Sequence, residues 1–257
     1  ERKRHELGVQ ANLARERQLS EMKSQFVSVA SHEFRTPLAA AVGTLELLDR
    51  HAAKLTEAKR VELIARIQRS LGRLTAIMND VLQLSRADSG RVKATRMNAD
   101  LVQLAQDILR EVESGDGEKH RFVFEPSGGP GTVPVDTKLT HHILSNLVGN
   151  AVRYSPAGTT VTVKLRIDEA AFTFHVIDEG IGIPEAEREH IFEPFARGSN
   201  VGQISGTGLG LNIVKRYTEL MGGTIELLPM ERGTTFKVRV PLAQSQSASP
   251  WLNPPPE

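Results

Sequence analysis

The chain has 257 residues, a formal net charge of +1 at pH 7 and 25% charged residues. Its length exceeds that of a typical single domain, and its balanced charge provides no electrostatic footprint for nucleic acid. The absence of cysteine excludes disulfides, thiolate metal sites and cysteine nucleophiles.

Residues 1–25 are charged and helix-prone, and Leu19, Met22 and Phe26 have coiled-coil spacing. This pattern predicts a signalling coiled coil or linker helix over residues 1–20. A solvated helical leader without a partner is the alternative. Because the chain begins without methionine inside a helical pattern, we expect a further portion upstream.

The helix is expected to continue to about Arg50, and Thr56 is suited to cap a second one. Two amphipathic helices with a short link near Lys54 predict an antiparallel hairpin domain over residues 21–90. A lone hairpin cannot bury both apolar faces, so we expect two copies to form a four-helix bundle. The apolar stripe of the second helix comprises Val61, Ile64, Ile67, Leu71, Leu74, Ile77, Met78, Val81 and Leu84.

His32 lies opposite the predicted buried face of the first helix and is therefore expected to be exposed. An exposed histidine is most often only a surface residue, but two neighbours make it a candidate nucleophile. Glu33 can accept a proton from the imidazole, and Thr36 follows one turn later. Pro37 predicts a local bend. The buried face is predicted to comprise Phe26, Ala30, Phe34, Pro37, Ala41, Leu45 and Leu48.

After a linker over residues 91–99, the pattern changes to mixed helix and strand over residues 100–243. Helices are expected at 101–112, 137–152 and 208–221. Strands are expected at 121–125, 160–167, 172–177, 224–228 and 234–240, with the last four forming two antiparallel pairs. The simplest assembly is an α/β two-layer sandwich. Residues 244–257 are polar and proline-rich, which predicts a disordered tail.

Four segments of this second region have the composition of nucleotide-binding loops. Taken singly, paired asparagines and glycine-rich turns are usually surface decoration, caps or plain loops. Their shared order, spacing and strand or helix context is more specific. The segments are Asn146-Leu147-Val148-Gly149-Asn150, Asp178-Glu179-Gly180-Ile181-Gly182, Ile191-Phe192-Glu193-Pro194-Phe195 and Gly206-Thr207-Gly208-Leu209-Gly210-Leu211.

Together these segments resemble the N, G1, F and G2 boxes of sensor histidine kinases, and residues 31–38 resemble their H box. The resemblance implies a dimeric phosphoacceptor hairpin followed by a Bergerat-type ATP-binding domain. It implies that His32 is the phosphoacceptor, that Asn150 is the Mg²⁺ ligand and that Asp178 reads adenine. It also assigns Asn146, Arg153 and Tyr154 to the nucleotide site.

The residue chemistry agrees with these assignments. The Asp178 carboxylate can accept a hydrogen bond from the adenine amine, while Gly180 and Gly182 let the backbone approach the base. Asn150 offers a neutral oxygen that can complete an octahedral Mg²⁺ shell. The loop formed by Gly206, Thr207, Gly208, Leu209 and Gly210 leads into a helix whose free N–H groups can meet phosphate oxygens.

Two further features concern the loop between the last two segments. Arg153 and Arg197 are candidates to neutralise phosphate charge, although Arg197 could equally be a plain surface arginine. Residues 195–205 predict a mobile lid with Phe192 and Phe195 at its root. The family often has an aromatic residue where this chain has Ala196, so a stacking role there is not expected.

The resemblance implies that relatives of this fold that hydrolyse ATP carry a glutamate that activates water where this chain has Asn146, and an amide cannot accept that proton. We therefore expect an enzyme, a protein-histidine kinase that uses ATP and Mg²⁺ to phosphorylate His32. The resemblance implies transfer to an aspartate of a response regulator, a homodimer and an upstream sensor domain.

Thr36 resembles the family residue that supports dephosphorylation of the regulator. An ATP-driven clamp and a non-catalytic nucleotide-binding dimer are the alternatives. Which subunit's pocket phosphorylates His32 stays open. No apolar run in the chain is long enough to cross a bilayer, which predicts a cytoplasmic piece with no membrane segment. Membrane attachment of the longer protein also stays open.

Overall fold

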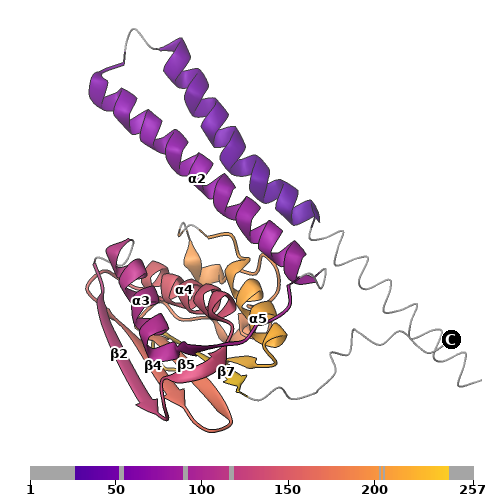
Figure 1. The fold of residues 1–257 in the computed structure, drawn as a ribbon. Helices are drawn as coiled ribbons and strands as arrows, with labels where there is room; N and C mark the ends of the chain where they lie inside the picture. The colour runs from indigo at the N-terminus through magenta and orange to yellow at the C-terminus, as the bar shows by residue number, and fades with distance from the viewer. Residues whose placement is uncertain are drawn as a thin grey trace, which may run out of the picture. The chain divides into compact units, whose positions relative to one another are not determined.

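The computed structural model describes residues 27–51, 55–88, 92–115, 119–202, 204 and 206–242. The chain divides into two compact units, with the boundary between Val81 and Leu82. The first unit is helical, and the second combines helices with strands (Figure 1). The predicted coiled coil over residues 1–20 and the predicted tail over residues 244–257 lie outside the described residues.

The first unit is a helical hairpin. Its first helix covers residues 27–50 and continues through Pro37 without interruption. The second helix, α2, extends over Glu57–Asp88, and its residues from Leu82 onward are grouped with the second unit. Thr56 Oγ1 accepts a hydrogen bond from the Lys59 N–H at 3.4 Å, at the predicted start of α2. The two helices lie alongside each other (Figure 1), and a Glu33–Arg73 ion pair joins them.

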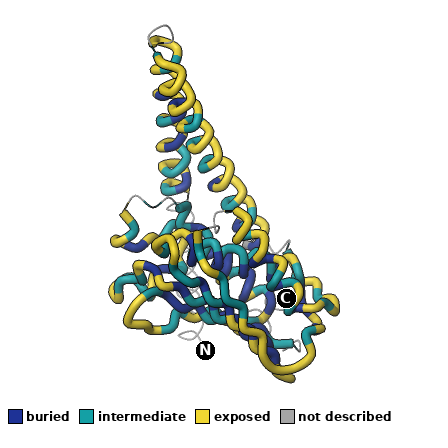
Figure 2. Tube along the Cα trace, turned by 90° about the vertical axis from the view of Figure 1, so that its left-hand side faces the viewer, coloured by how far each residue is buried: buried dark blue, intermediate teal, exposed yellow. Residues whose placement is uncertain are grey.

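Only a narrow row of the hairpin is buried within one chain (Figure 2). Ala30, Ala41 and Ile77 are buried, as predicted. Leu45 was predicted to be buried, but it is 54% exposed. The hairpin buries Leu63, Ile77 and Leu84 of α2 together with Ala30 and Ala41, and other large apolar side chains stay exposed. From the predicted stripe of α2, these exposed residues are Val61, Ile64, Leu71 and Met78.

The second unit is a two-layer α/β sandwich, as predicted. Its five-stranded sheet has the order β2-β4-β5-β7-β6, in which β2 and β4 are parallel and all other pairs are antiparallel. Helices α3, α4 and α5 cover one face of the sheet (Figure 1). The helices are α3 (Leu101–Ser114), α4 (Thr137–Tyr154) and α5 (Gly210–Leu220), and the strands are β2 (Arg121–Gly128), β4 (Thr160–Ile167), β5 (Ala171–Asp178), β6 (Thr224–Leu228) and β7 (Thr234–Pro241).

The core lies between the sheet and its helices. On β4 the side chains alternate, so that Val161, Val163 and Leu165 are buried while Lys164 and Arg166 are exposed. The central strand β5 contributes Phe172 and Phe174, whose rings pack edge to face at 5.7 Å. Burying each of these phenylalanines contributes about 1.5–3 kcal/mol to stability.

A two-stranded ribbon, which the sequence did not predict, precedes and follows α3. It pairs β1 (Met97–Asp100) with β3 (Thr132–Val135) in antiparallel register. Residues 97–99, assigned to the linker from the sequence, therefore form most of β1. An aspartate at the end of each strand caps a helix: Asp100, the last residue of β1, caps α3, and Asp136, which follows β3, caps α4 through its Oδ1 and the Leu139 N–H.

Candidate active site

His32 is an exposed side chain on the first helix of the hairpin. Its side chain is 73% exposed, and its Nδ1 lies 3.9 Å from Oε1 of Glu33. The Thr36 hydroxyl donates to the His32 carbonyl oxygen at 3.2 Å, one turn further along the helix. The structure therefore confirms the predicted exposure of His32 and places a carboxylate beside one ring nitrogen.

Glu33 is itself held from the second helix. Its Oε2 accepts a hydrogen bond from the Arg73 guanidinium at 3.2 Å, and both side chains are partly buried. The Arg73 Nε atom is buried, and within the described residues it has no hydrogen-bond partner. Sequence reasoning did not single out Arg73, because its position opposite Glu33 depends on how the two helices align.

Helix α4 carries four of the predicted nucleotide residues along its length. Asn146 Nδ2 donates to the His142 carbonyl oxygen at 2.9 Å, which leaves Oδ1 as the free end of the amide. Asn150 follows one turn later and is partly exposed, and Arg153 is exposed. Tyr154 ends the helix, and its carbonyl oxygen accepts a hydrogen bond from the Ile181 N–H at 3.1 Å.

Asp178 lies at the end of β5, where it is only 5% exposed. Its Oδ1 accepts hydrogen bonds from the N–H groups of Gly180 at 2.8 Å and Thr234 at 3.0 Å. Burial raises the pKa of this carboxyl to about 6, although the two backbone donors favour the charged form. Thr234 was not among the predicted site residues; its place opposite Asp178 is set by the pairing of β5 with β7.

Gly180 brings the loop after β5 against the end of α4. A methyl group placed on Gly180 would lie 2.6 Å from the Tyr154 carbonyl oxygen and 2.7 Å from Asp178 Oδ1. Ser155 Oγ would lie 3.0 Å from the same methyl group, and it is buried without a hydrogen-bond partner among the described residues. Gly182 has φ of +70°, a conformation that favours glycine. Both glycines therefore meet a backbone requirement.

The glycine loop before α5 also approaches α4. A methyl group on Gly206 would lie 3.0 Å from the Tyr154 hydroxyl, and one on Gly210 would lie 2.9 Å from Asn146 Oδ1. The structure thus brings three of the four predicted segments together around the C-terminal half of α4. The Leu209 side chain is fully buried. Only the backbone of Leu209 can therefore contact a ligand.

The remaining segment contacts this loop through its last residue. Phe195 has φ of +64°, and Gly208, with φ of +71°, packs so closely that a methyl group on it would lie 2.7 Å from the Phe195 Cα. Phe192 packs against Phe236 of β7, with ring centroids 6.1 Å apart. Arg197 is exposed and donates to the Ile204 carbonyl oxygen, so its side chain is committed to the loop.

The predicted lid contains a short 3₁₀ helix, η2 (Ser199–Val201), rather than only irregular chain. Glu187, the last residue of η1 (Glu185–Glu187), accepts hydrogen bonds from the Ser199 N–H at 2.9 and 3.0 Å. Asn200 Nδ2 donates to the carbonyl oxygens of Ile181 and Gly182. These contacts tie the segment to the loop that follows Asp178.

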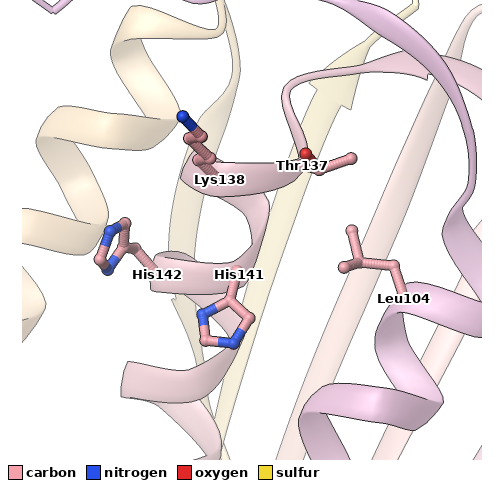
Figure 3. A pocket seen from close by; sticks show the side chains of 5 residues that line it. All are labelled: Leu104, Thr137, Lys138, His141 and His142. Carbon is pink, nitrogen blue, oxygen red and sulfur yellow. The ribbon is translucent and has the colours of Figure 1, made fainter.

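An open pocket of about 330 Å³ lies between α3 and α4, away from these loops (Figure 3). None of the predicted nucleotide residues lines it. Its lining residues are Leu104, Thr137, Lys138, His141 and His142. His141 is held by Glu111 of α3 at 2.9 Å, and His142 has its pKa lowered by burial and by the neighbouring His141. We therefore place the candidate nucleotide site at the meeting loops and not in this pocket.

Comparison with known protein families identifies both units. Residues 22–90 match the His Kinase A (phospho-acceptor) domain, and residues 135–244 match the histidine kinase-, DNA gyrase B- and HSP90-like ATPases. The chain belongs to the sensor histidine kinases. Within the described residues of this kinase, no helix is long and apolar enough to span a membrane.

Individual relatives agree with the family. The kinase is 37% identical over 220 residues to the Mycobacterium tuberculosis protein named "Probable sensor histidine kinase TcrY", a match that covers 85% of this chain and 46% of that protein. It is 30% identical over 269 residues to the autoinducer 2 sensor kinase/phosphatase LuxQ of Vibrio vulnificus, covering 96% of this chain and 30% of LuxQ. The chain therefore spans less than half the length of these relatives.

A solved structure of ShkA in complex with AMPPNP has a similar fold. It matches with a TM-score of 0.62 and 29% sequence identity, over 86% of this kinase and 46% of ShkA.

Proposed function

We propose that this chain is the catalytic core of a dimeric sensor histidine kinase that transfers the γ-phosphoryl group of ATP to His32. One observation carries the proposal. The exposed His32 imidazole has the Glu33 carboxylate 3.9 Å from Nδ1, on a chain that also folds an ATPase domain of the histidine kinase type. A histidine with a purely structural role would need neither an exposed side chain nor a carboxylate beside its ring.

The position of Glu33 supports a different role for each ring nitrogen. Because Glu33 lies on the Nδ1 side, the lone pair of Nε2 is the one available to attack the γ-phosphorus. As the N–P bond forms, the bond from that phosphorus to the β–γ bridging oxygen breaks, and ADP leaves with the electron pair. Glu33 accepts the Nδ1 proton, which prevents positive charge from accumulating on the ring. Arg73 holds the Glu33 carboxylate in place through its 3.2 Å contact with Oε2.

The nucleotide is held by residues of the second unit. Asp178 would bind the adenine amine, and Gly180 and Gly182 would let the loop approach the base. The N–H groups from Gly206 to Gly210, at the start of α5, would meet the phosphates. The buried Ser155 Oγ, which lacks a partner in the described residues, is a polar atom that a bound nucleotide could satisfy.

A divalent cation also fits the residues present. The partly exposed Asn150 side chain makes no hydrogen bond to the described residues, so its amide oxygen is available as the protein ligand for Mg²⁺. When bound, Mg²⁺ would neutralise charge on the β- and γ-phosphates. Arg153, exposed near Gly206, could supply further positive charge.

The partners follow from the family. Phosphohistidine would pass its phosphoryl group to an aspartate of a response-regulator receiver domain, under the control of a sensor domain in the longer protein. The exposed Thr36 side chain, one turn from His32, would orient water on the phosphorylated regulator. LuxQ, named a kinase/phosphatase, supports a second, phosphatase activity.

The phosphorylation test uses γ-labelled ATP. The protein should acquire an acid-labile, base-stable label that disappears in His32→Gln. The control His51→Gln changes another exposed histidine at the end of the same helix and should leave the label intact. Free phosphate without labelled protein would support an ATP-driven clamp instead, and nucleotide binding with neither product would support a non-catalytic dimer.

The phosphatase activity has its own test, in which Thr36→Ala is mixed with a phosphorylated regulator. The variant should retain autophosphorylation and dephosphorylate the regulator more slowly. Thr75→Ala is the matched control, because Thr75 is also an exposed threonine whose hydroxyl donates to a carbonyl oxygen one turn back. Loss of autophosphorylation with unchanged phosphatase activity would contradict the role given to Thr36.

A further inference from the structure

The segment that leads from the hairpin into the ATPase domain is fastened to the cap of α4. Residues 92–96, here called the strap, have no regular secondary structure and run directly into β1. The Thr95 N–H donates to Asp136 Oδ2 at 2.7 Å, while Asp136 Oδ1 accepts the Leu139 N–H at 2.9 Å. One buried carboxylate, 7% exposed, thus holds the strap and caps α4 at once.

The next residue of the strap is fastened to the end of α5. The Arg96 guanidinium donates through one nitrogen to the carbonyl oxygens of Pro241 and Leu242, each at 2.7 Å. Its other terminal nitrogen donates to the Met221 carbonyl oxygen at 2.8 Å, immediately after α5 ends. A cation at this position also interacts favourably with the helix dipole.

These two anchors lie at adjacent helix ends. Met221 Sδ lies 4.0 Å from Thr140 Oγ1, near the start of α4. The His142 ring points from α4 toward α5 (Figure 3) and packs against Tyr217 at 5.5 Å. The strap therefore fastens two helices that already pack together, at the start of α4 and at the end of α5.

The candidate nucleotide residues lie toward the opposite ends of the same two helices. Asn150 and Tyr154 are in the last turns of α4, and Gly206–Gly210 precede and begin α5. With a rise of about 1.5 Å per residue, the 18 residues of α4 reach about 27 Å from the strap to the site. A small change in the α4–α5 packing near the strap would move Asn146 and Asn150 of α4 relative to the glycine loop Gly206–Gly210.

We propose that Asp136 and Arg96 are positioning residues through which the strap sets the packing of α4 against α5 and so the affinity for ATP. The strap connects the phosphoacceptor hairpin covalently to the ATPase domain. A conformational change in the hairpin would therefore alter the affinity of the nucleotide site through the strap. This inference rests on the proposed ATP-binding function. It concerns how the site is held, and not which residues touch the nucleotide.

The test measures the dissociation constant of a non-hydrolysable ATP analogue with Mg²⁺, using the full chain. Asp136→Asn retains a good N-cap oxygen for α4 but presents an amide N–H₂ group to the Thr95 N–H. Asp100→Asn is the matched control, because Asp100 caps α3 and makes no hydrogen bond to the strap. We expect Asp136→Asn and Arg96→Ala to weaken binding by about two- to thirty-fold, and the control to change it less than twofold.

Two readouts separate positioning from mere stabilisation. Arg96→Lys, which keeps the charge and one donor group, should recover part of the affinity. Reciprocity requires that the analogue, in the wild-type chain, slow hydrogen exchange of the Thr95 amide. Unchanged affinity in both folded variants, or unchanged exchange at Thr95 under saturating analogue, would overturn the inference. Failure of the wild-type chain to bind the analogue would instead overturn the proposed function.

Discussion

The buried carboxylate of Asp178 combines two opposing effects. Burial favours its neutral form, and the N–H groups of Gly180 and Thr234 favour its charged form; burial is the larger effect, so the pKa rises from 3.8 to about 6. Because the folded-state pKa is the higher one, the folded protein binds the proton more tightly. This group therefore favours folding below pH 3.8, and its contribution is lost as the pH rises through about 6.

This balance predicts how Asp178 responds to nucleotide. In the nucleotide-free protein, its carboxyl ¹³C resonance should titrate with a midpoint near pH 6. Adenine donates its amine hydrogen to the charged carboxylate, so saturating ADP should shift the midpoint to lower pH. A midpoint unaffected by ADP would mean that Asp178 does not contact the base.

Substitution of Asp178 separates binding from folding. In Asp178→Asn the amide oxygen can still accept the two backbone N–H groups, and no charge is buried. We expect stability at pH 8 equal to or above that of the wild type in thermal unfolding. Because the variant loses a charge-assisted hydrogen bond worth about 1.5–3 kcal/mol, ATP binding should weaken roughly 10- to 100-fold. Tight ATP binding by the folded variant would exclude Asp178 as the adenine reader.

Glu33 is the proposed proton acceptor for His32, and Arg73 holds its carboxylate in position. If Glu33 accepts the Nδ1 proton, Glu33→Gln should lower the initial rate of autophosphorylation by about 10²- to 10⁴-fold. Arg73→Ala should lower the rate less, since the base remains but is no longer held. Arg69→Ala removes an exposed arginine from the same helix and serves as the control. Binding of ATP should be unchanged in all three variants, and a Glu33→Gln rate equal to wild type would rule out this base.

At the scale of elements, the site depends on close approaches between loops and α4. Gly208 has a positive φ and packs against the Phe195 backbone, so the glycine loop and the preceding segment fix each other. Asn212 of α5 adds a second link, because its Nδ2 donates to the Phe192 carbonyl oxygen at 2.8 Å. The glycine loop and the Phe192–Phe195 segment are therefore held together by backbone packing at Gly208 and by the Asn212 side chain.

This arrangement predicts different fates for two glycines. In Gly208→Ala the new methyl group would lie 2.7 Å from backbone atoms, and the left-handed conformation adds about 1–2 kcal/mol. We expect the loop to move and ATP binding to be largely lost. Gly149→Ala, inside α4 with open space around it, should instead leave binding intact and stabilise the helix by about 1 kcal/mol. Calorimetric titration with an ATP analogue, together with thermal unfolding, checks both variants, and equal effects would refute the packing argument.

Features that depend on local pattern could be read from the sequence. Alternation along 160–167 and 172–177 predicted a pair of adjacent antiparallel strands, which the structure confirms. Asp178 lies at the end of the second strand, as predicted. Contacts set by register or by helix alignment could not be read in this way. Thr234 meets Asp178 only because β7 pairs with β5, and Arg73 meets Glu33 only because two helices align. The short ribbon of β1 and β3 has too few residues to show a periodicity.

The two units differ in how completely they bury their apolar side chains. The second unit has a closed core, whereas most residues along the hairpin are not buried in the single chain (Figure 2), and many of its large apolar residues are exposed. Val42, Leu45 and Leu71 are each 46–54% exposed there. Exposed apolar surface of this extent marks an interaction surface. Dimerisation into a four-helix bundle is the partner arrangement that we propose for it.

That arrangement makes the hairpin surface testable by a single charge. Leu45→Glu places a carboxylate where an apolar side chain would be buried in the bundle, so desolvation of the charge should oppose association. In sedimentation equilibrium the wild-type chain should be dimeric, and Leu45→Glu should dissociate at much lower loading. Gln68→Glu adds the same charge at an exposed polar position of α2 and should stay dimeric. All three chains should bind an ATP analogue equally, because the proposed nucleotide residues all belong to the other unit. A wild-type monomer, or a Leu45→Glu dimer as tight as the control, would contradict the bundle and leave the apolar surface for a different partner.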